Sequence, residues 1–301
     1  ASVLYLYLKE KLRYQVVLGA LTILFLFDMV GTARRYLNTS DFHKSSKIEK
    51  PFVMSAVDKE ILEDKGHYRV ANFVGNFMND GATSYFHKSI GGYHAAKLGR
   101  YQELVDFHIS KNNMEVLDML NTKYFIIPDE SGKKGLQVNP TSNGNAWFVK
   151  DVEFVDSANK EILSLFDFKS KSTAIVNKIE FADFQKKYQV SLIDTTAQIV
   201  LQSYEANKIK YQSKSTTEQL AVFSEVYYKE GWNAYIDGEL VSHIRVNYVL
   251  RALPIPAGGH TIVFKFEPTI IAKGSLFNIG SWALFLVALG IGFYRKKQKD
   301  N

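Results

Sequence analysis

Apolar residues gather in two long runs near the ends of the chain, and mixed polar and apolar positions fill the sequence between them. Residues 274–294 contain no charged side chain and are followed by a basic tail that starts at Arg295. The hydrocarbon core of a bilayer is about 30 Å thick and needs about 20 apolar residues in a helix. This run therefore predicts a transmembrane helix over 274–294 and a cytoplasmic tail over 295–301. A buried helix of a soluble protein is the alternative, but such a helix seldom ends in a basic run.

The other apolar run opens the chain. Residues 1–8 are mostly apolar, the basic segment 9–13 follows, and residues 14–30 are apolar again except for Asp28. The pattern predicts the end of one transmembrane helix, a tight basic loop and a second transmembrane helix over 14–30. A signal peptide is the alternative, and the apolar stretch before the basic loop argues against it. Because the chain starts inside an apolar segment without Met, we expect it to be the C-terminal piece of a longer membrane protein.

The charges beside these runs predict which way the chain crosses the membrane. Much of the formal net charge of +6 lies in the two basic flanks, at 9–13 and 295–301. Two antiparallel spans place both flanks on one side, and the positive-inside rule makes that side cytoplasmic. Residues 31–273 are then expected on the outer side. This middle part has little basic excess, which argues against nucleic acid as a partner.

The first half of the middle part mixes two periodicities. Helical and strand-like spacings alternate over 31–140, which predicts a mixed α/β subdomain after a polar connector at 31–50. The expected elements are helices over 56–65, 93–109 and 113–121, and strands over 68–74 and 123–128. Residues 75–89 and 129–144 are rich in turn formers and are expected to be a loop and a hinge.

The second half, over 141–273, has a period close to two. Many short strands at regular spacing favour an antiparallel β-sandwich. The expected strands lie at 147–155, 173–177, 189–196, 197–206, 208–214, 219–228, 233–237, 239–247, 248–256 and 260–266. A helix at 157–167 with Ser157 as N-cap interrupts them, and Asp237-Gly238 predicts a type I′ hairpin turn. The predicted fold is α+β, with a mostly antiparallel, jelly-roll-like β-sandwich in the outer part, flanked by transmembrane helices.

The residue types exclude several kinds of chemistry. The chain has no Cys, which excludes a disulfide scaffold, an iron–sulfur cluster, thiol catalysis and a thiolate zinc site. The spacing of His87, His94 and His108 matches no metal-binding motif, so a structural or surface role is expected for them. No serine-hydrolase or P-loop motif is present. Carboxylate pairs for glycoside hydrolysis are brought together by the fold, so their sequence spacing excludes little.

Residues 84–102 have the most unusual composition of the chain, with Lys, Arg, His and Tyr around Gly91-Gly92 at the expected start of a helix. Helix N-termini with nearby glycine amides attract phosphate, and tyrosine faces suit sugar rings. The candidate substrate-binding residues are Lys88, Tyr93, His94, Lys97 and Arg100. The alternative is a glycine-rich loop before an amphipathic helix whose basic face is only solvated.

Two aromatic residues beside the expected hairpin form another candidate. Trp232 and Tyr235 would contact a glycan if the sandwich exposes them, whereas burial in the core is the alternative. Asp28 lies near the outer end of its expected span, where it is either a functional acid or a marker of the water boundary.

Several of these segments in combination resemble the YfhO-like family of bacterial membrane proteins, in the form found in Bacteroidetes-type bacteria. The resemblance covers nearly the whole chain and rests on SYFHKSIGGYHAAKLGRYQ, GNAWFVKDVEFVDSANKEIL, GWNAYIDG and PAGGHTIVFKFEP. It implies a polytopic protein of the bacterial inner membrane, related to C-type membrane glycosyltransferases, with a large periplasmic domain. Such enzymes use a polyprenyl-phosphate-linked sugar at the outer face of the membrane. The presumed catalytic acid of the family lies upstream, so the resemblance implies no catalytic residue and no cofactor in this chain, and it leaves a divalent metal in the parent protein open.

Three functions follow from these observations. The first is an accessory domain that positions a polyprenyl-phosphate sugar or an envelope glycan for the upstream membrane half of the same protein, and that is inactive alone. The second is a non-enzymatic, membrane-tethered module that binds glycan or protein. The third is a stand-alone hydrolase, which requires two carboxylates about 5–10 Å apart in a cleft.

Overall fold

The computed structural model describes residues 5, 7–9, 12–42, 44–188 and 194–300. The chain divides into two compact units, Ala1–Val53 and Met54–Asn301. The first unit contains α2 (Tyr14–Tyr36), η1 (Thr39–Asp41) and α3 (Ser45–Glu49). Most of the predicted span at 1–8 and of the predicted strand at 189–196 lies outside the described residues.

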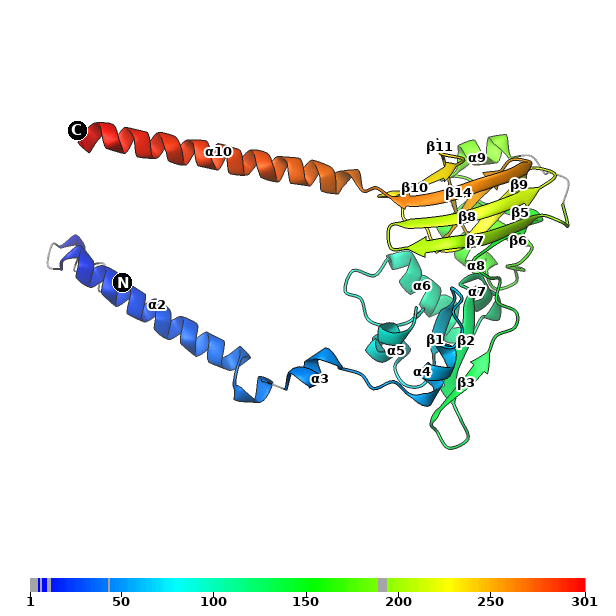
Figure 1. Ribbon diagram of the computed structural model, residues 1–301, viewed down its shortest axis with the longest axis horizontal. Coiled ribbons are helices and arrows are strands. Elements are labelled where there is room, and N and C mark those ends of the chain that lie inside the picture. The colour runs from blue at the N-terminus through cyan, green and yellow to red at the C-terminus, as the bar shows by residue number, and fades with distance from the viewer. Residues whose placement is uncertain (1–4, 6, 10–11, 43, 189–193, 301) are drawn as a thin grey trace. The chain divides into compact units, whose positions relative to one another are not determined.

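In the described part of the chain, two helices are long and apolar enough to cross a membrane, namely Tyr14–Tyr36 and residues Thr269–Arg295 of α10 (Thr269–Asp300). Figure 1 shows both as long single helices. Their large apolar side chains are exposed, as in Phe27 at 81% and Leu284 at 73%. Leaving such a side chain in water forfeits about 1.5–3 kcal/mol each, which argues against core helices of a soluble protein. Both helices contain the residues of the predicted spans and continue beyond them, and their crossing of a membrane stays a prediction.

Besides the long helix α10, the second unit contains strands and short helices. Its strands are β1 (Arg69–Asn72), β2 (Thr122–Pro128), β3 (Lys134–Val138), β4 (Ala146–Val149), β5 (Asp151–Val155), β6 (Thr173–Asn177), β7 (Gln198–Glu205), β8 (Lys208–Ser215), β9 (Gln219–Val226), β10 (Trp232–Ile236), β11 (Glu239–Val241), β12 (Ile244–Val246), β13 (Leu250–Ile255) and β14 (Gly258–Phe266). Its other helices are α4 (Ala56–Ile61), η2 (Phe77–Asn79), α5 (Gly81–Phe86), α6 (Gly99–Phe107), η3 (Ile109–Lys111), α7 (Met114–Met119), α8 (Ala158–Ser164) and α9 (Ala182–Lys187).

Two antiparallel sheets face each other across a shared core. Their strand orders are β11-β10-β14-β8-β7 and β12-β13-β9-β4. β8 alternates strictly between exposed and buried residues, and its buried Tyr211 meets Phe223 of the facing sheet with ring centroids 4.9 Å apart. The facing surfaces of both sheets contribute to one apolar cluster. The α+β class with mostly antiparallel sheets is thus confirmed, while the jelly-roll detail stays a prediction.

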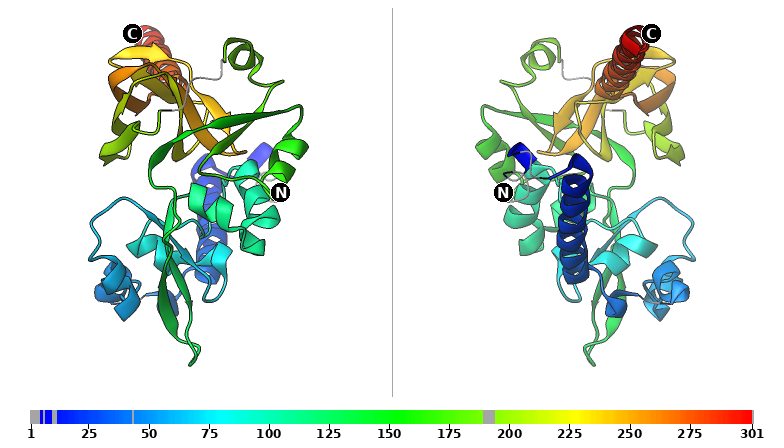
Figure 2. Two further views of the ribbon diagram at one scale, coloured as in Figure 1. Left: turned by 90° about the vertical axis from the view of Figure 1, so that its right-hand side faces the viewer. Right: turned by 90° about the vertical axis from the view of Figure 1, so that its left-hand side faces the viewer.

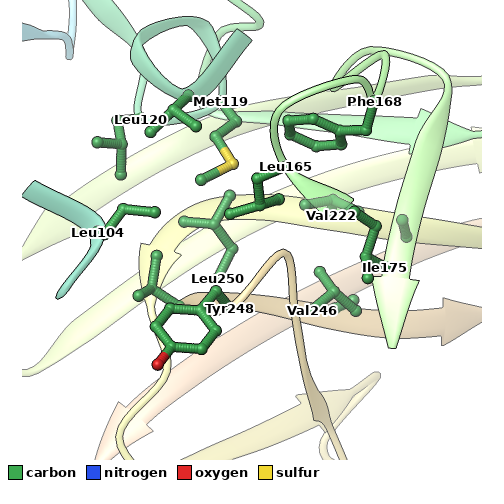
Figure 3. Close-up of a cluster of buried hydrophobic side chains, with 14 of the residues drawn as sticks. Leu104, Met119, Leu120, Leu165, Phe168, Ile175, Val222, Val246, Tyr248 and Leu250 are labelled. Atoms are coloured by element: carbon green, nitrogen blue, oxygen red, sulfur yellow. The ribbon is translucent and has the colours of Figure 1, made fainter. Parts of the chain in front are cut away.

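The four-stranded sheet is covered on both sides. β9 is buried from Gln219 to Glu225, because alternate residues enter different cores. Phe223 faces the five-stranded sheet, whereas Val222 joins a second cluster with Leu104, Leu120 and Leu165 from the helices (Figure 3). Figures 1 and 2 show the β2–β3 hairpin at one end of this unit and the five-stranded sheet at the other. The mixed α/β part and the sandwich therefore share a continuous core.

Two segments expected to lack regular structure contain short elements. Residues 75–89 hold η2 and α5, and the carboxylate of Asp80 caps α5 by accepting hydrogen bonds from the amides of Ala82 and Thr83. The hinge expected at 129–144 contains β3, which pairs with β2 in antiparallel fashion. These three elements are too short for sequence periodicity to predict them, because their formation depends on their hydrogen-bond partners.

The helix expected over 93–109 is shorter than predicted. α6 begins at Gly99, and the side chains of Tyr93, His94, Ala95 and Ala96 before it are exposed. A short helix is stabilised mainly by burying one face, which these residues do not do. The predicted turn at Asp237-Gly238 is confirmed, with φ of 51° and 94° as a type I′ turn requires.

Candidate functional site

A cavity of about 500 Å³ lies beside the stretch that the sequence singles out. β1, the segment before α6 and α6 itself supply most of its walls. Its polar lining residues are Arg69, Ser84, Ser89, Tyr93, His94, Lys97 and Tyr101. The cavity therefore combines cations, hydroxyl groups and two tyrosine rings in one hollow.

The wall beside β1 is held by backbone hydrogen bonds. The amide of Val70 donates to the carbonyl of Lys88 at 2.9 Å, and the amide of Ile90 donates to the carbonyl of Val70 at 3.1 Å. Tyr101 of α6 ties the opposite wall to this segment, because its hydroxyl donates to the carbonyl of Ile90 at 2.6 Å. Burial raises the pKa of Tyr101 to about 12, so the hydroxyl keeps its proton.

The two cations of the cavity differ in their partners. Arg69 is fixed, since its Nη1 donates to the carbonyls of Leu120 at 2.9 Å and Ser224 at 2.6 Å, and its Nη2 lies 3.3 Å from Oε1 of Glu225. The Nζ of half-buried Lys97 makes a longer hydrogen bond of 3.4 Å to the carbonyl of Gly92. Lys97 is therefore the cation more readily available to an anionic ligand.

The five candidate residues from 84–102 do not all meet. Tyr93, His94 and Lys97 line the cavity together. Lys88 lies outside it, exposed, with its Nζ 5.3 Å from the ring centre of Tyr204. Arg100 joins an ion-pair network elsewhere, described below. Whether these residues bind substrate stays a prediction. The cavity supports the prediction for Tyr93, His94 and Lys97.

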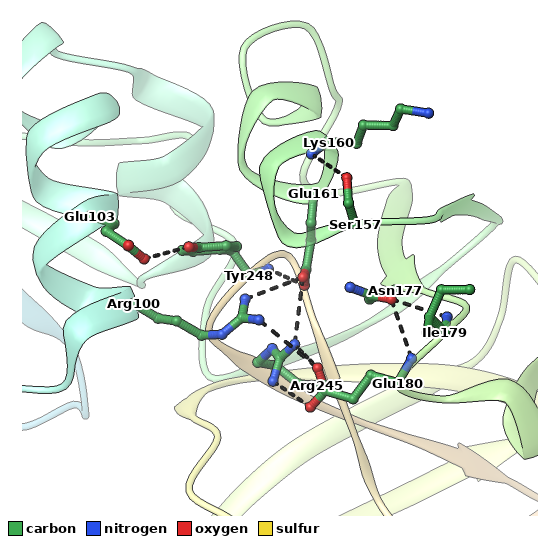
Figure 4. Close-up of polar contacts among 10 residues, drawn as sticks. All are labelled: Arg100, Glu103, Ser157, Lys160, Glu161, Asn177, Ile179, Glu180, Arg245 and Tyr248. Carbon is green, nitrogen blue, oxygen red and sulfur yellow. Dashed lines mark hydrogen bonds and ion pairs between the residues drawn. The ribbon is translucent and has the colours of Figure 1, made fainter.

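That network surrounds Glu161 of α8, whose side chain is fully buried. Its Oε2 lies 3.2 Å from Arg100 and 3.5 Å from Arg245, and its Oε1 accepts from the amide of Tyr248 at 3.1 Å (Figure 4). Glu180 accepts two hydrogen bonds from Arg245, at 2.7 and 2.5 Å. Burial raises the pKa of Glu161, and the two arginines oppose this shift. Arg100 therefore has a structural role, because its ion pair connects α6 to α8.

Trp232 and Tyr235 of β10 do not line the cavity. The ring of Trp232 lies 5.4 Å from that of Phe266, centre to centre, and the guanidinium carbon of Arg251 lies 4.2 Å from the Trp232 ring centre. The hydroxyl of Tyr235 donates to Oε2 of Glu267 at 2.7 Å. Their predicted glycan contact stays a prediction.

Gly91 and Gly92 permit a close approach between their loop and η2. A Cβ on Gly91 would lie 2.4 Å from the carbonyl oxygen of Phe77. Gly92 has a φ of +97°, and its amide donates to the same carbonyl at 2.8 Å. The two glycines precede α6 by several residues, so they shape a cavity wall and do not form a helix N-terminus.

This geometry predicts that Gly91→Ala lowers the free energy of unfolding by about 1–3 kcal/mol, because the added methyl group overlaps backbone. Gly99→Ala is the matched control, since a Cβ there has no neighbour within 4 Å and alanine favours a helix. Urea unfolding of the purified chain in detergent micelles, followed by circular dichroism, measures both. Equal stability of the two variants would contradict the close approach.

A second cavity, of about 510 Å³, lies between β4 and β7. Two of its charged groups, Lys171 and Asp194, already have partners. The Nζ of Lys171 donates to the carbonyl of Asn143 at 2.8 Å, and the carboxylate of Asp194 accepts from Thr196 and Thr216. Burial lowers the pKa of Lys171. Lys171 and Asp194 are therefore less available to a ligand of this cavity.

The sequence does not single out Arg69, Ser84 or Ser89 as site residues. Arg69 is visible only as a lone cation at the start of an apolar strand. Among the described residues that line the first cavity none is Asp or Glu, and no group of three His, Asp or Glu in the described part of the chain lies close enough to hold a metal ion. The arrangement suits binding of an anionic or hydroxyl-rich ligand.

One comparison with known proteins found a match, and it covers the part of the chain that contains the sandwich. A family model described as bacterial membrane protein YfhO matches residues 129–277. A search of curated proteins and a search of solved structures gave no match. The matched range contains β3 to β14 and the start of α10, but not Tyr93, His94 or Lys97.

Proposed function

Because the chain is a YfhO-like bacterial membrane protein, we propose that its second unit positions substrate for a membrane glycosyltransferase that serves cell-envelope glycosylation. The cavity beside Tyr93 and Lys97 carries this proposal. A polyprenyl-phosphate sugar needs a cation for its phosphate, an apolar ring face for its sugar and hydrogen-bonding groups for its hydroxyls. The cavity supplies all three kinds of group within one hollow.

The domain is accessory in this proposal. Transfer of a sugar requires a group that accepts a proton from the acceptor hydroxyl, most often a carboxylate or a histidine. The described lining of the cavity holds His94, whose Nδ1 accepts a hydrogen bond from the amide of Ala96 at 3.1 Å, and no carboxylate. The reacting groups then come from another part of the membrane protein, and the domain lies on the periplasmic side of the inner membrane, where lipid-linked sugars are used.

The test replaces two cavity residues in the full-length protein. The Tyr93→Ala, Lys97→Gln double variant is expected to lower kcat/KM for transfer from polyprenyl-phosphate hexoses at least about tenfold, since a charged hydrogen bond contributes about 1.5–3 kcal/mol. Tyr93 is 75% exposed, so its loss leaves the core intact. Membrane preparations from cells that produce each variant give the rates of sugar transfer.

Lys186→Gln is the matched control, because Lys186 is an exposed cation on α9 that does not line the cavity. Its transfer rate is expected to equal that of the unchanged protein. Arg100→Ala is unsuitable, since it breaks the pair with buried Glu161. Full activity of the double variant would reject the cavity as a substrate site, whereas no transfer activity in the unchanged protein would favour the non-enzymatic envelope module.

A further inference from the structure

The sandwich is joined to α10 by only two residues. β14 ends at Phe266 and α10 begins at Thr269. An extended residue spans at most about 3.6 Å, so the end of β14 lies within about 11 Å of the first residue of α10. This limit follows from chain length and holds for any angle between helix and sheet.

The linker is also attached to the sandwich. The amide of Glu267 donates to the carbonyl of Gly231 at 2.6 Å. The carboxylate of Glu267 accepts from Asn233 at 2.8 Å and from the hydroxyl of Tyr235 at 2.7 Å. A Cβ on Gly231 would lie 2.7 Å from the ring of Phe266, so the loop before β10 lies directly against the last residue of β14. The linker therefore belongs to the folded domain.

The length of α10 indicates the depth at which this linker lies. The candidate membrane span of α10, Thr269–Arg295, has 27 residues. At 1.5 Å per residue it spans about 40 Å, which matches a bilayer of about 40–45 Å that includes the headgroup layers. Ile270 and Ile271 are exposed apolar residues in the first turn. Thr269 then lies at headgroup level, and the end of the sandwich lies at the same level.

This end of the sandwich, the rim, consists of residues 206–208, 228–232 and 265–268. Lys208 pairs with Lys265, and the amide of Phe266 donates to the carbonyl of Asn207 at 2.9 Å. Tyr228 is 41% exposed, and Trp232, four positions later in the chain, is partly exposed. Tyrosine, tryptophan and lysine are the residues that anchor proteins at membrane interfaces.

We propose that the rim rests in the headgroup region of the bilayer, with Tyr228 and Trp232 as its aromatic contacts. The inference goes beyond substrate positioning and rests on α10 spanning the membrane. Lys208, Lys229 and Lys265 are offset by Glu230 and Glu267, so aromatic anchoring, more than attraction to anionic lipid, holds the rim. Contact at the rim and a short, attached linker give the substrate-positioning domain a defined height above the membrane.

The test uses labels at single cysteines, which is direct because the chain has no Cys of its own. Tyr228→Cys and Lys208→Cys place a bimane fluorophore on the rim. Lys214→Cys is the matched control, since Lys214 is another exposed lysine of β8 and lies about 20 Å further along the strand at 3.3 Å per residue. The whole chain is reconstituted in phosphatidylcholine vesicles with or without a nitroxide on the lipid headgroup.

The rim labels are expected to lose fluorescence severalfold in nitroxide vesicles, and the Lys214 label is expected to keep it. Equal quenching at Lys208 and Lys214, or none at the rim, overturns the proposal. A label at Leu284→Cys, with the nitroxide moved into the acyl chain, reports separately on α10. Quenching at Leu284 without quenching at the rim rejects the rim contact alone, whereas no quenching at Leu284 rejects the span and the rim together. These experiments measure fluorescence and not sugar transfer. A failure of the rim contact is therefore distinguishable from a failure of the proposed function.

Discussion

Replacing Glu161 by Ala is expected to lower the free energy of unfolding of the second unit by about 3–5 kcal/mol, the usual cost of leaving a buried charge without its partner. Glu161 is fully buried and lies between Arg100 and Arg245, whose side chain is 7% exposed. Without the carboxylate, the two guanidinium groups face each other with only Glu180 to balance them. Arg245 would then lose its buried partner and could not reach water.

Glu180→Ala is the matched control for this prediction. Glu180 pairs with the same Arg245 but is 43% exposed, so the loss is expected to be about 0–1 kcal/mol. Urea unfolding of both variants in detergent micelles, followed by circular dichroism, compares them directly. Similar losses for the two glutamates would show that burial of Glu161 does not govern the strength of this network.

Lowering the pH from 6.5 to 4 is expected to destabilise the second unit through two largely buried histidines. Burial lowers the pKa of His67 to about 3 and that of His243 to about 4, from an ordinary value of 6.5. In this pH range the unfolded chain binds protons that the folded chain does not, so stability is complete above pH 6.5 and falls with the pH. Each histidine contributes a loss of about 3 kcal/mol by pH 4, at about 1.4 kcal/mol per pH unit.

The surroundings of His67 explain why a nearby carboxylate does not protect it. Its Nε2 lies 3.9 Å from Oε1 of Glu225, which is beyond hydrogen-bonding distance, and Arg69 pairs with that carboxylate. Arg69 and Lys88 add to the shift by repulsion, after burial. Burial raises the pKa of Glu161, so this group acts in the opposite direction and offsets part of the loss.

Thermal unfolding of His67→Phe between pH 6.5 and 4 tests this prediction, because phenylalanine keeps the ring contact with Tyr204 and removes the titration. The variant is expected to lose less stability than the unchanged chain over this range. His260→Gln is the control: an exposed pair with Asp237 raises the pKa of His260, so removing it gives no protection against acid. An unchanged pH dependence in His67→Phe would contradict the assignment to His67.

The two proposals place substrate binding and membrane contact in separate parts of the same unit. Tyr93, His94 and Lys97 offer a hollow for a phosphate and a sugar, whereas Tyr228 and Trp232 offer aromatic rings at the end that continues into α10. A lipid-linked sugar is itself held at headgroup level by its polyprenyl chain. A domain with a defined height above the bilayer would therefore meet its substrate at a defined depth.

The two long apolar helices, most strands and the hairpin turn at Asp237-Gly238 were predictable, because each depends on residues close together in the sequence. Hydrophobic runs, a period of two and a Gly in a turn are local signals. The same signals could not show that β9 is covered on both faces, since that depends on which elements pack against Phe223 and Val222. They also could not predict β3, because this segment forms a strand by pairing with β2.

The sequence by itself determined where the chain is apolar enough for a membrane and where it alternates as strands, since hydropathy and periodicity belong to neighbouring residues. Only the tertiary structure decided which polar residues meet. Arg100 looks like a substrate contact in the sequence, but Glu161 lies 61 positions away along the chain and takes it into a buried network. Arg69 is also distant from Tyr93 and Lys97 in the sequence, and only the fold brings it into their cavity. Contacts between distant residues arise when the shared core folds, because burial of apolar surface selects the arrangement and the polar groups follow it.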